Sequence, residues 1–431
     1  MRRRAQLLAA VVLACLLHAS VASRASSYDS LDDVARGYVL LVLRIDQHEP
    51  GFNDYYYGPA DVREQVTREG KRPLEELRAQ AEALRAALPN TRGNPVRRRW
   101  FEKQLAALET KIRMLQGEQF SVAEQARRLF DLEVQPPTNA ELEAALTALD
   151  QALPGPGSLL DRVKAWRAHF RLPPTRVEAA YRIALEEVQA RARKLLLLPP
   201  QERVELYFVT GQAWGGYNWF QGNARSRIEI NTDLPTLATS VYSYIAHEAY
   251  PGHHTDLTTR EQRLFHERGY FEWCVSPLYT PQSTMAEAVA EVGKDILMPP
   301  AERYAWHRDV FFPRLELAAA DVATWEKLQP LLETLSRVRE RLPFMLHDEG
   351  ASEEAMVAFL QKYALMDPAR ARKTIQFDRE WGVYSFNYTV GREILRRYLA
   401  TGNARAKFIQ LLTIPIFPSL IEEWIAEGAE P

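Results

Sequence analysis

Apolar residues recur at helical spacing over most of the chain. One such stretch covers residues 31–45, and a longer one covers 74–115 with an interruption at 88–95, LPNTRGNP. Three more segments show the same period between Pro- and Gly-rich separators: 139–153, 159–170 and 176–197. Apolar side chains three or four positions apart lie on one face of a helix, and Pro and Gly end such helices. The pattern predicts a mainly α protein.

The period changes between residues 204 and 233. Residues 204–209, VELYFV, are rich in β-formers, and 226–233, SRIEINTD, alternate between apolar and polar side chains. Such alternation is typical of a half-buried strand. The stretch between them, 211–225, is full of Gly, Asn and aromatic residues. We therefore expect two strands of a small sheet, joined by a functional loop.

Helical spacing resumes at residue 237 and continues nearly to the end of the chain. No clear linker interrupts it, so we expect one large helical domain. Within it, residues 24–200 form an N-terminal helical region, and residues 201–431 form the region that carries the candidate chemistry. A separable N-terminal helical lobe is the alternative.

The charge balance limits the classes of partner that we expect the chain to bind. The chain of 431 residues has 54 Lys and Arg against 56 Asp and Glu, a net charge of −2. A protein that binds nucleic acid or an anionic membrane usually carries a clustered basic excess. The composition therefore predicts neither partner, and its 46% hydrophobic content is that of an ordinary globular protein.

The N-terminal residues 1–23 have the plan of a secretory signal peptide. Three arginines are followed by an apolar stretch and by small residues at its end. The apolar stretch is shorter than the about 20 residues that a spanning helix needs. We expect an exported protein, periplasmic or extracellular. An uncleaved membrane anchor and lipid attachment at Cys15 are the alternatives, although Leu13 stands where a lipid-attachment box usually has a small residue.

Removal of that segment leaves Cys274 as the single cysteine. One thiol cannot form an internal disulfide, so stability has to come from the hydrophobic core. We expect Cys274 to be a buried, unreactive side chain.

The candidate chemistry concentrates at 247–254, HEAYPGHH. Three of the nine histidines of the chain lie here, with one glutamate. Imidazole is a common zinc ligand, and a catalytic zinc site typically uses three protein ligands and leaves one position for water. A carboxylate that follows the first ligand can act as general base beside that water. His247 is therefore a predicted ligand of one zinc ion, and Glu248 is the predicted base.

The spacing leaves the second ligand open between two histidines. Pro251 stands where an H-E-x-x-H helix has its second histidine, and a proline there disrupts the preceding turn. On an undistorted helix His254 would share a face with His247. If a bulge absorbs two residues, His253 takes that place instead, and we favour His253. The remaining histidine would then be a donor behind the ligands or a substrate contact.

A third ligand is predicted on the helical segment 283–297. Glu287 and Glu291 lie four positions apart, among apolar neighbours. A carboxylate is rarely buried without a cation or a metal ion. We expect Glu287 to be the third ligand and Glu291 to orient a ligating histidine. An ordinary pair of solvated glutamates is the alternative.

HEAYPGHH resembles the domain of unknown function 885 family, whose members are considered zincin-like metallohydrolases. Three other segments resemble parts of that family: FNDYYYGP at 52–59, SRIEINTD at 226–233 and YSFNYTVGREIL at 384–395. Glu287 matches an acidic residue that the family usually follows with Gly-Trp-Ala, whereas Ala-Val-Ala follows it here. The resemblance implies a large helical zincin-like domain with a deep channel and a small β-sheet beside the metal-site helix.

The resemblance also implies further site residues. The strand 225–231 would lie above the metal and bind a peptide by backbone pairing, with Asn218 and Asn231 on the same rim. The family's Tyr-x-x-Gly segment maps onto Tyr388 and Gly391. Tyr384, Tyr388 and Arg392 recur at four-residue spacing. A hydroxyl or guanidinium from this face would stabilise the negative charge that peptide hydrolysis builds on the carbonyl oxygen. We expect Tyr388 to be catalytic and Arg392 to bind substrate.

These observations predict an exported zinc metallopeptidase that acts on short peptides or peptide-like substrates. One alternative is an amidase that cleaves a non-peptide amide. Another is a non-catalytic protein that binds metal or peptide, which the Ala-Val-Ala departure leaves open.

Overall fold

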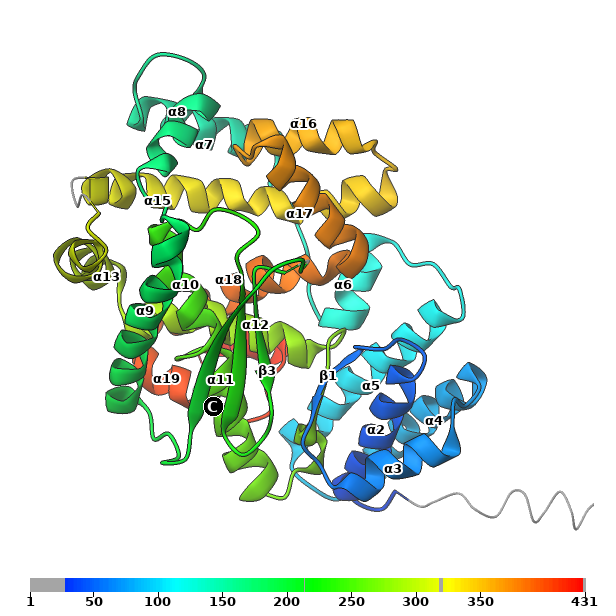
Figure 1. Ribbon diagram of the computed structural model, residues 1–431. Helices are drawn as coiled ribbons and strands as arrows, with labels where there is room; N and C mark the ends of the chain where they lie inside the picture. Colours follow the sequence, from blue (N-terminus) through cyan, green and yellow to red (C-terminus); the bar gives the residue numbers. More distant parts are fainter. Residues whose placement is uncertain (1–27, 213, 318–320, 429–431) are drawn as a thin grey trace, which may run out of the picture.

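The computed structural model describes residues 28–212, 214–317 and 321–428 (Figure 1). The predicted signal peptide, residues 1–23, lies outside this part of the chain. Within the described residues, no helix combines the length and the apolar character that a membrane crossing requires.

Four helices form the N-terminal part of the fold, at the lower right of Figure 1: α2 (Leu31–Asp46), α3 (Ala60–Glu69), α4 (Leu74–Ala87) and α5 (Pro95–Leu115). Ser30 begins α2 with a capping box, in which its hydroxyl accepts from the backbone N–H of Asp33. Asn94 caps α5, because its side-chain oxygen accepts from the backbone N–H groups of Val96 and Arg97. The interruption predicted at 88–95 separates α4 from α5, because Pro89 and Pro95 cannot continue a helix.

The remaining helices surround a small sheet. They are α6 (Val122–Phe130), α7 (Asn139–Ala152), α8 (Leu159–Ala168), α9 (Pro174–Leu195), α10 (Ala238–Glu248), α11 (His253–Arg260), α12 (Pro281–Leu297), α13 (Pro300–Trp306), α14 (Phe312–Arg314), α15 (Val322–Ser336), α16 (Glu353–Tyr363), α17 (Pro368–Trp381), α18 (Arg392–Leu399), α19 (Ala404–Leu411) and α20 (Pro418–Glu427). The predicted mainly α fold with a small sheet is confirmed.

The sheet has three strands in the order β2-β4-β3: β2 (Arg203–Val209), β3 (Gly216–Phe220) and β4 (Arg225–Asn231). β4 pairs with β2 in parallel and with β3 in antiparallel orientation. Two expectations are therefore corrected. The segment predicted as a loop contains β3, and β4 is the central strand, so it has no free edge for the backbone pairing with a peptide that the resemblance implied. The sequence GYNWF did not predict β3, because Gly and Asn are both depleted in strands.

Two shorter strands join distant parts of the sequence. β1 (Asn53–Tyr56) lies in the aromatic segment FNDYYYGP and pairs with β5 (Val275–Pro277), directly after Cys274. Cys274 is buried and free, and burial raises the pKa of its thiol well above the usual value. The pairing brings the N-terminal segment next to the start of α12.

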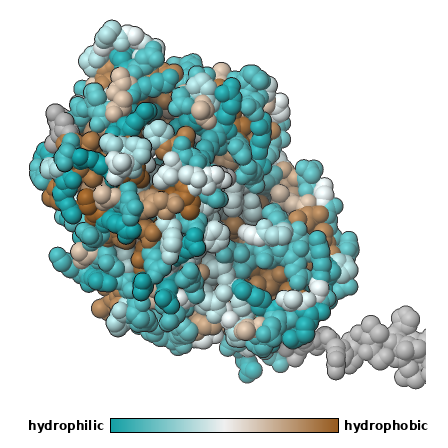
Figure 2. All heavy atoms as spheres, viewed as in Figure 1, coloured by the Kyte–Doolittle hydropathy of each residue, from teal (hydrophilic) through white to brown (hydrophobic). Residues whose placement is uncertain are grey.

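The hydrophobic core of the described residues has two large clusters of buried residues and a small third one, formed by Tyr55, Phe220 and Leu257. One combines α2, α4 and α5 with residues around Trp273. The other extends from Val122 to Ile421 and includes the inward-facing Ile228 and Ile230 of β4. This second cluster contains residues from both sides of position 200, and the division of the chain at that point stays a prediction. On the face shown in Figure 2, hydrophilic residues predominate and hydrophobic ones form small separate groups.

Candidate metal centre

The backbone between α10 and α11 decides which side chains meet at the site. α10 ends at Glu248, and α11 begins at His253. Pro251 has no N–H to continue α10, and Gly252 passes directly against the end of that helix. A Cβ on Gly252 would lie 1.8 Å from the carbonyl oxygen of His247, so only glycine fits. The opening of the helix that Pro251 predicts is therefore present.

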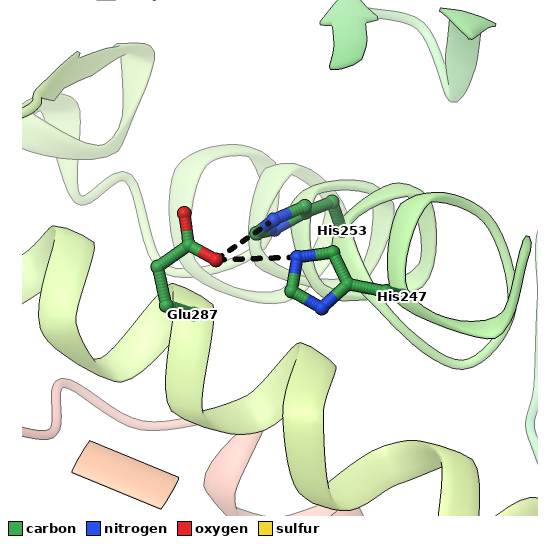
Figure 3. Close-up of side chains that lie close together, drawn as sticks. All are labelled: His247, His253 and Glu287. Carbon is green, nitrogen blue, oxygen red and sulfur yellow. Dashed lines mark ion pairs between the residues drawn. The ribbon is translucent and has the colours of Figure 1, made fainter. Parts of the chain in front are cut away.

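Three predicted ligands converge from three helices (Figure 3). His247 lies in the last turn of α10, His253 begins α11, and Glu287 lies on α12. Nε2 of His247 is 3.2 Å from Oε2 of Glu287, and Nε2 of His253 is 3.4 Å from the same oxygen. One ligand atom from each residue lies within 4.8 Å of the other two. The group can hold a metal ion.

The surroundings of Glu287 fit a cation. Its Oε2 is buried and makes no hydrogen bond to any described residue, although two imidazoles face it. Burial opposes ionisation of Glu287, yet His253 and His247 outweigh it and lower its pKa to about 2. Burial likewise opposes the charged form of His247, and Glu287 and Glu291 outweigh it, so the pKa of His247 lies well above its usual value. Two imidazoles and one carboxylate form a donor set used by catalytic zinc sites.

Two further side chains contact two of the three candidate ligands. The hydroxyl of Tyr384 donates to Oε1 of Glu287 at 2.9 Å, which leaves Oε2 to face the histidines. Oε1 of Glu291 lies 3.1 Å from Nδ1 of His247, and its other oxygen accepts from Lys294 at 2.8 Å. The contact of Glu291 with His247 is the one that the sequence predicts. Such partners orient metal-binding side chains in known sites.

Glu248 lies beside this group rather than within it. Together with His247 it lines two adjoining cavities, one of about 650 Å³ and one of about 100 Å³. Burial raises the pKa of Glu248, and the charges of His247 and His253 oppose that shift. Gly216 of β3 approaches Glu248 closely, since an added Cβ would lie 3.3 Å from Oε1. The Glu248 carboxylate is thus available to a molecule in the cavities.

Tyr388 lines both cavities from a π-helical turn, Asn387–Gly391, that precedes α18. Its ring centroid lies 6.1 Å from that of His247. Burial, with the nearby charges of Glu287 and Glu248, raises the pKa of Tyr388 well above its usual value. The hydroxyl therefore stays protonated and can donate a hydrogen bond.

The two predicted asparagines line the cavities and also bind backbone. Asn218 lines the smaller cavity and donates from its side chain to the backbone carbonyl of Glu248 at 2.7 Å. Asn231 lines the larger one and donates to the backbone carbonyls of Gln212 and Trp214 at 2.9 and 2.8 Å. Asn218 thus ties the middle of β3 to the end of α10, and Asn231 ties the end of β4 to the segment before β3.

His254 does not join the candidate ligands, which corrects the expectation that it could be one. Its Nδ1 lies 2.8 Å from Oγ of Ser226, and its Nε2 lies 3.3 Å from Oε2 of Glu202. Glu202 also accepts from Arg193 and from the hydroxyl of Tyr250. Burial lowers the pKa of His254. This ring ties the start of α11 to β4 and to the residue before β2.

Arg392 also lies apart from the candidate ligands, and its predicted contact with substrate stays a prediction. Its guanidinium is 3.0 Å from Glu333 and 3.9 Å from Glu291, and it lines a cavity of about 320 Å³ that shares Glu291 and Arg167 with the larger cavity. The four-residue spacing assumed a regular helix. The π-helical turn ahead of α18 changes the rotation per residue, so Arg392 leaves the face of Tyr388.

Two residues near the site were not predicted from the sequence. Asp54 of β1 and Tyr217 of β3 line the smaller cavity together with His253 and Glu287, and the hydroxyl of Tyr217 donates to Asp54. Burial raises the pKa of Asp54 to about 6, although Tyr217 opposes the shift. The acidic residue within FNDYYYGP was the available signal, but only the fold brings β1 next to β3.

The sequence matches no family model and no curated protein. Among solved structures it is similar to a proposed lipoprotein from Colwellia psychrerythraea, with 14% identity, a TM-score of 0.49, and 81% of this chain and 66% of that one covered. The chain thus spans just under two thirds of that protein.

A proposed lipoprotein of unknown function from Shewanella oneidensis shows 12% identity and a TM-score of 0.45, with 95% of this chain and 84% of that one covered. The Pyrococcus furiosus carboxypeptidase shows 11% identity and a TM-score of 0.38, with coverage of 91% and 90%. The metal centre of this chain is therefore inferred from its own residues.

Proposed function

We propose that the protein is a metal-dependent hydrolase that cleaves peptide bonds of short peptides. His247, His253 and Glu287 would hold one zinc ion. The observation that carries the proposal is the buried Oε2 of Glu287, which faces two imidazoles and has no hydrogen bond to any described residue, while Glu248 lines the adjoining cavities. A bound ion would polarise a substrate carbonyl and lower the pKa of a water molecule at the site.

The protein's own side chains would handle the proton and the charge. Glu248 is a base whose pKa is raised by burial, so it would take the proton of the attacking water and pass it to the leaving amine. The hydroxyl of Tyr388 would donate to the carbonyl oxygen as negative charge develops there. Glu291 and Tyr384 would hold His247 and Glu287 in position.

The sheet supports a peptide substrate. Among the described strands, β3 pairs only with β4, so its other edge is open to backbone pairing. Gly216 of that strand lines both cavities with Glu248, and its missing side chain leaves room for a peptide backbone near the carboxylate. The larger cavity, about 650 Å³, is in the size range of sites for small ligands. This size favours short peptides over folded proteins.

A peptide library incubated with zinc-loaded protein and read by mass spectrometry tests the proposal. We expect cleavage of internal or terminal peptide bonds, abolished in Glu248→Gln although that variant retains zinc. Glu267→Gln is the matched control, because Glu267 lies far from the cavities and pairs with Arg263. Turnover retained by Glu248→Gln would refute the role of this base. Tight peptide binding without any product would favour a non-catalytic binding protein.

Two proposals accompany this function. The motif at 247–254 supports membership of the domain of unknown function 885 family, and residues 1–23 support export. N-terminal sequencing of protein recovered outside the cytoplasm would test export. Cleavage near residue 23 is the expected result, and a start at Met1 would contradict it. A lipid-modified Cys15 would favour the lipoprotein alternative.

A further inference from the structure

The larger cavity beside the candidate metal centre has a basic lining. Arg167 from α8, Arg339 from the turn after α15, and Arg370 and Lys373 from α17 all line it. Its acidic lining residues are Glu248 and Glu291, which belong to the metal centre. Every other charged side chain of the lining is therefore a cation. The chain as a whole has a net charge of −2, so this concentration of cations is local.

Most of these cations have no carboxylate partner within the described residues. Arg167 donates to the backbone carbonyl of Leu365 at 3.1 Å and forms no ion pair there. Burial, together with Arg370, lowers the pKa of Arg167 to about 10, although Asp367 opposes the shift. In the same described part of the chain, Arg339 and Arg370 form no ion pair, although the charge of Arg339 acts on the buried Asp378. Lys373 lies 3.7 Å from Asp233.

The outward face of α17 shows the opposite arrangement. Arg379 lies 2.7 Å from Glu353, and Arg372 lies 3.7 Å from the same carboxylate. The helix therefore neutralises basic side chains on its outer face and leaves Arg370 without a partner at the cavity. Arg167, Arg339 and Lys373 are half-buried, whereas Arg370 is exposed at the cavity. Because a half-buried charge is costly without a counter-charge, an anionic ligand would stabilise this group of cations.

We infer that the substrate is a peptide or peptide-like amide with acidic side chains, whose carboxylates bind Arg167, Arg339, Arg370 and Lys373. This inference rests on the proposed function and names the substrate class for the same site. A single terminal carboxylate is satisfied by one bidentate arginine. Four cations from three elements therefore fit several carboxylates better than one. Their combined field in a cavity also attracts anionic substrates.

Binding can be measured without turnover in zinc-loaded Glu248→Gln by titration calorimetry. Three pentapeptides, all acetylated at the N-terminus, separate the sources of negative charge. The first is Ala-Glu-Ala-Glu-Ala amide, the second is Ala-Gln-Ala-Gln-Ala amide, and the third is Ala-Gln-Ala-Gln-Ala with a free terminal carboxylate. We expect the first to bind at least about tenfold more tightly than the second, as charge-assisted contacts allow. Its affinity should fall as salt is raised.

The role of the four cavity-lining cations is tested in double variants that combine Arg370→Gln or Lys373→Gln with Glu248→Gln. Both positions are on the cavity side of α17, and Arg370 is exposed enough to be replaced without disturbing the core. Each change should weaken the glutamate peptide about tenfold and leave the glutamine peptide unaffected. Arg372→Gln, from the outer face of the same helix, is the matched control and should change neither affinity.

Three results would overturn the inference: equal affinity for the glutamate and glutamine amides, a preference for the free terminal carboxylate alone, or no binding of any peptide. A failure of the proposed function has a different signature. In that case the unaltered protein would hydrolyse no peptide, while the glutamate peptide would still bind more tightly than its glutamine counterpart.

Discussion

Replacement of Gly252 by alanine should disrupt the metal centre without touching a ligand. The new Cβ would lie 1.8 Å from the carbonyl oxygen of His247, whereas side-chain carbons keep at least 3.0 Å from such atoms. The backbone at 252 must therefore move by at least 1.2 Å relative to His247. His253 is the next residue, so the same movement separates the two imidazoles.

Metal ligands tolerate displacements of only about 0.2 Å from their usual distances. A shift several times larger should reduce zinc affinity by at least about 100-fold, the upper end of what the loss of supporting contacts costs. The assay is a competition titration of zinc against a chelating dye, on variant protein whose circular dichroism shows native helix content.

Gly70→Ala is the matched control. Gly70 follows α3 with φ of +69°, and no atom lies within 4 Å of an added Cβ. Its replacement should cost about 1 kcal/mol of stability through backbone strain and leave zinc affinity unchanged. A folded Gly252→Ala that binds zinc as tightly as the unaltered protein would refute the geometry assigned to the break between α10 and α11.

Three further predictions concern the centre and the core. His247→Ala should remove the metal itself, so elemental analysis of purified protein should find zinc in the unaltered chain and none in the variant. Tyr384→Phe removes the donor to Oε1 of Glu287 and should weaken zinc binding by about tenfold, whereas unchanged affinity would exclude a positioning role. Asp378 is fully buried, and burial raises its pKa to about 7 although Arg339 and Ser385 oppose the shift. The pKa of Asp378 is higher in the folded than in the unfolded protein. The free energy of unfolding should therefore fall by up to about 4 kcal/mol as pH rises from about 4 to 7. Denaturant unfolding at pH 5 and pH 8 should show a smaller difference for Asp378→Asn, and an equal difference would contradict this account.

The helices were predictable because local spacing determines them. The capped start of α2 and the Pro- and Gly-rich break before α5 are each determined by residues that are adjacent in the sequence. β3 was not predictable, because a strand rich in Gly and Asn is stabilised by its pairing with β4 and its packing on α10, not by its own propensity.

The candidate site was likewise predictable only in part. The dense histidine cluster and its neighbouring glutamate pointed to a metal, and the proline showed that the helix must open. The choice between His253 and His254 depends on the backbone path through Gly252, which spacing alone does not determine. Asp54 was missed because it reaches the site through the pairing of β1 with β5, far apart in sequence.

Anomalous X-ray diffraction at the zinc absorption edge, from crystals of the zinc-loaded protein, tests the central claim most directly. The expected result is one anomalous peak bonded to Nε2 of His247, Nε2 of His253 and a carboxylate oxygen of Glu287, with Glu248 beside it and His254 still bound to Ser226. A peak coordinated by His254 instead, or no peak among these side chains, would contradict the account.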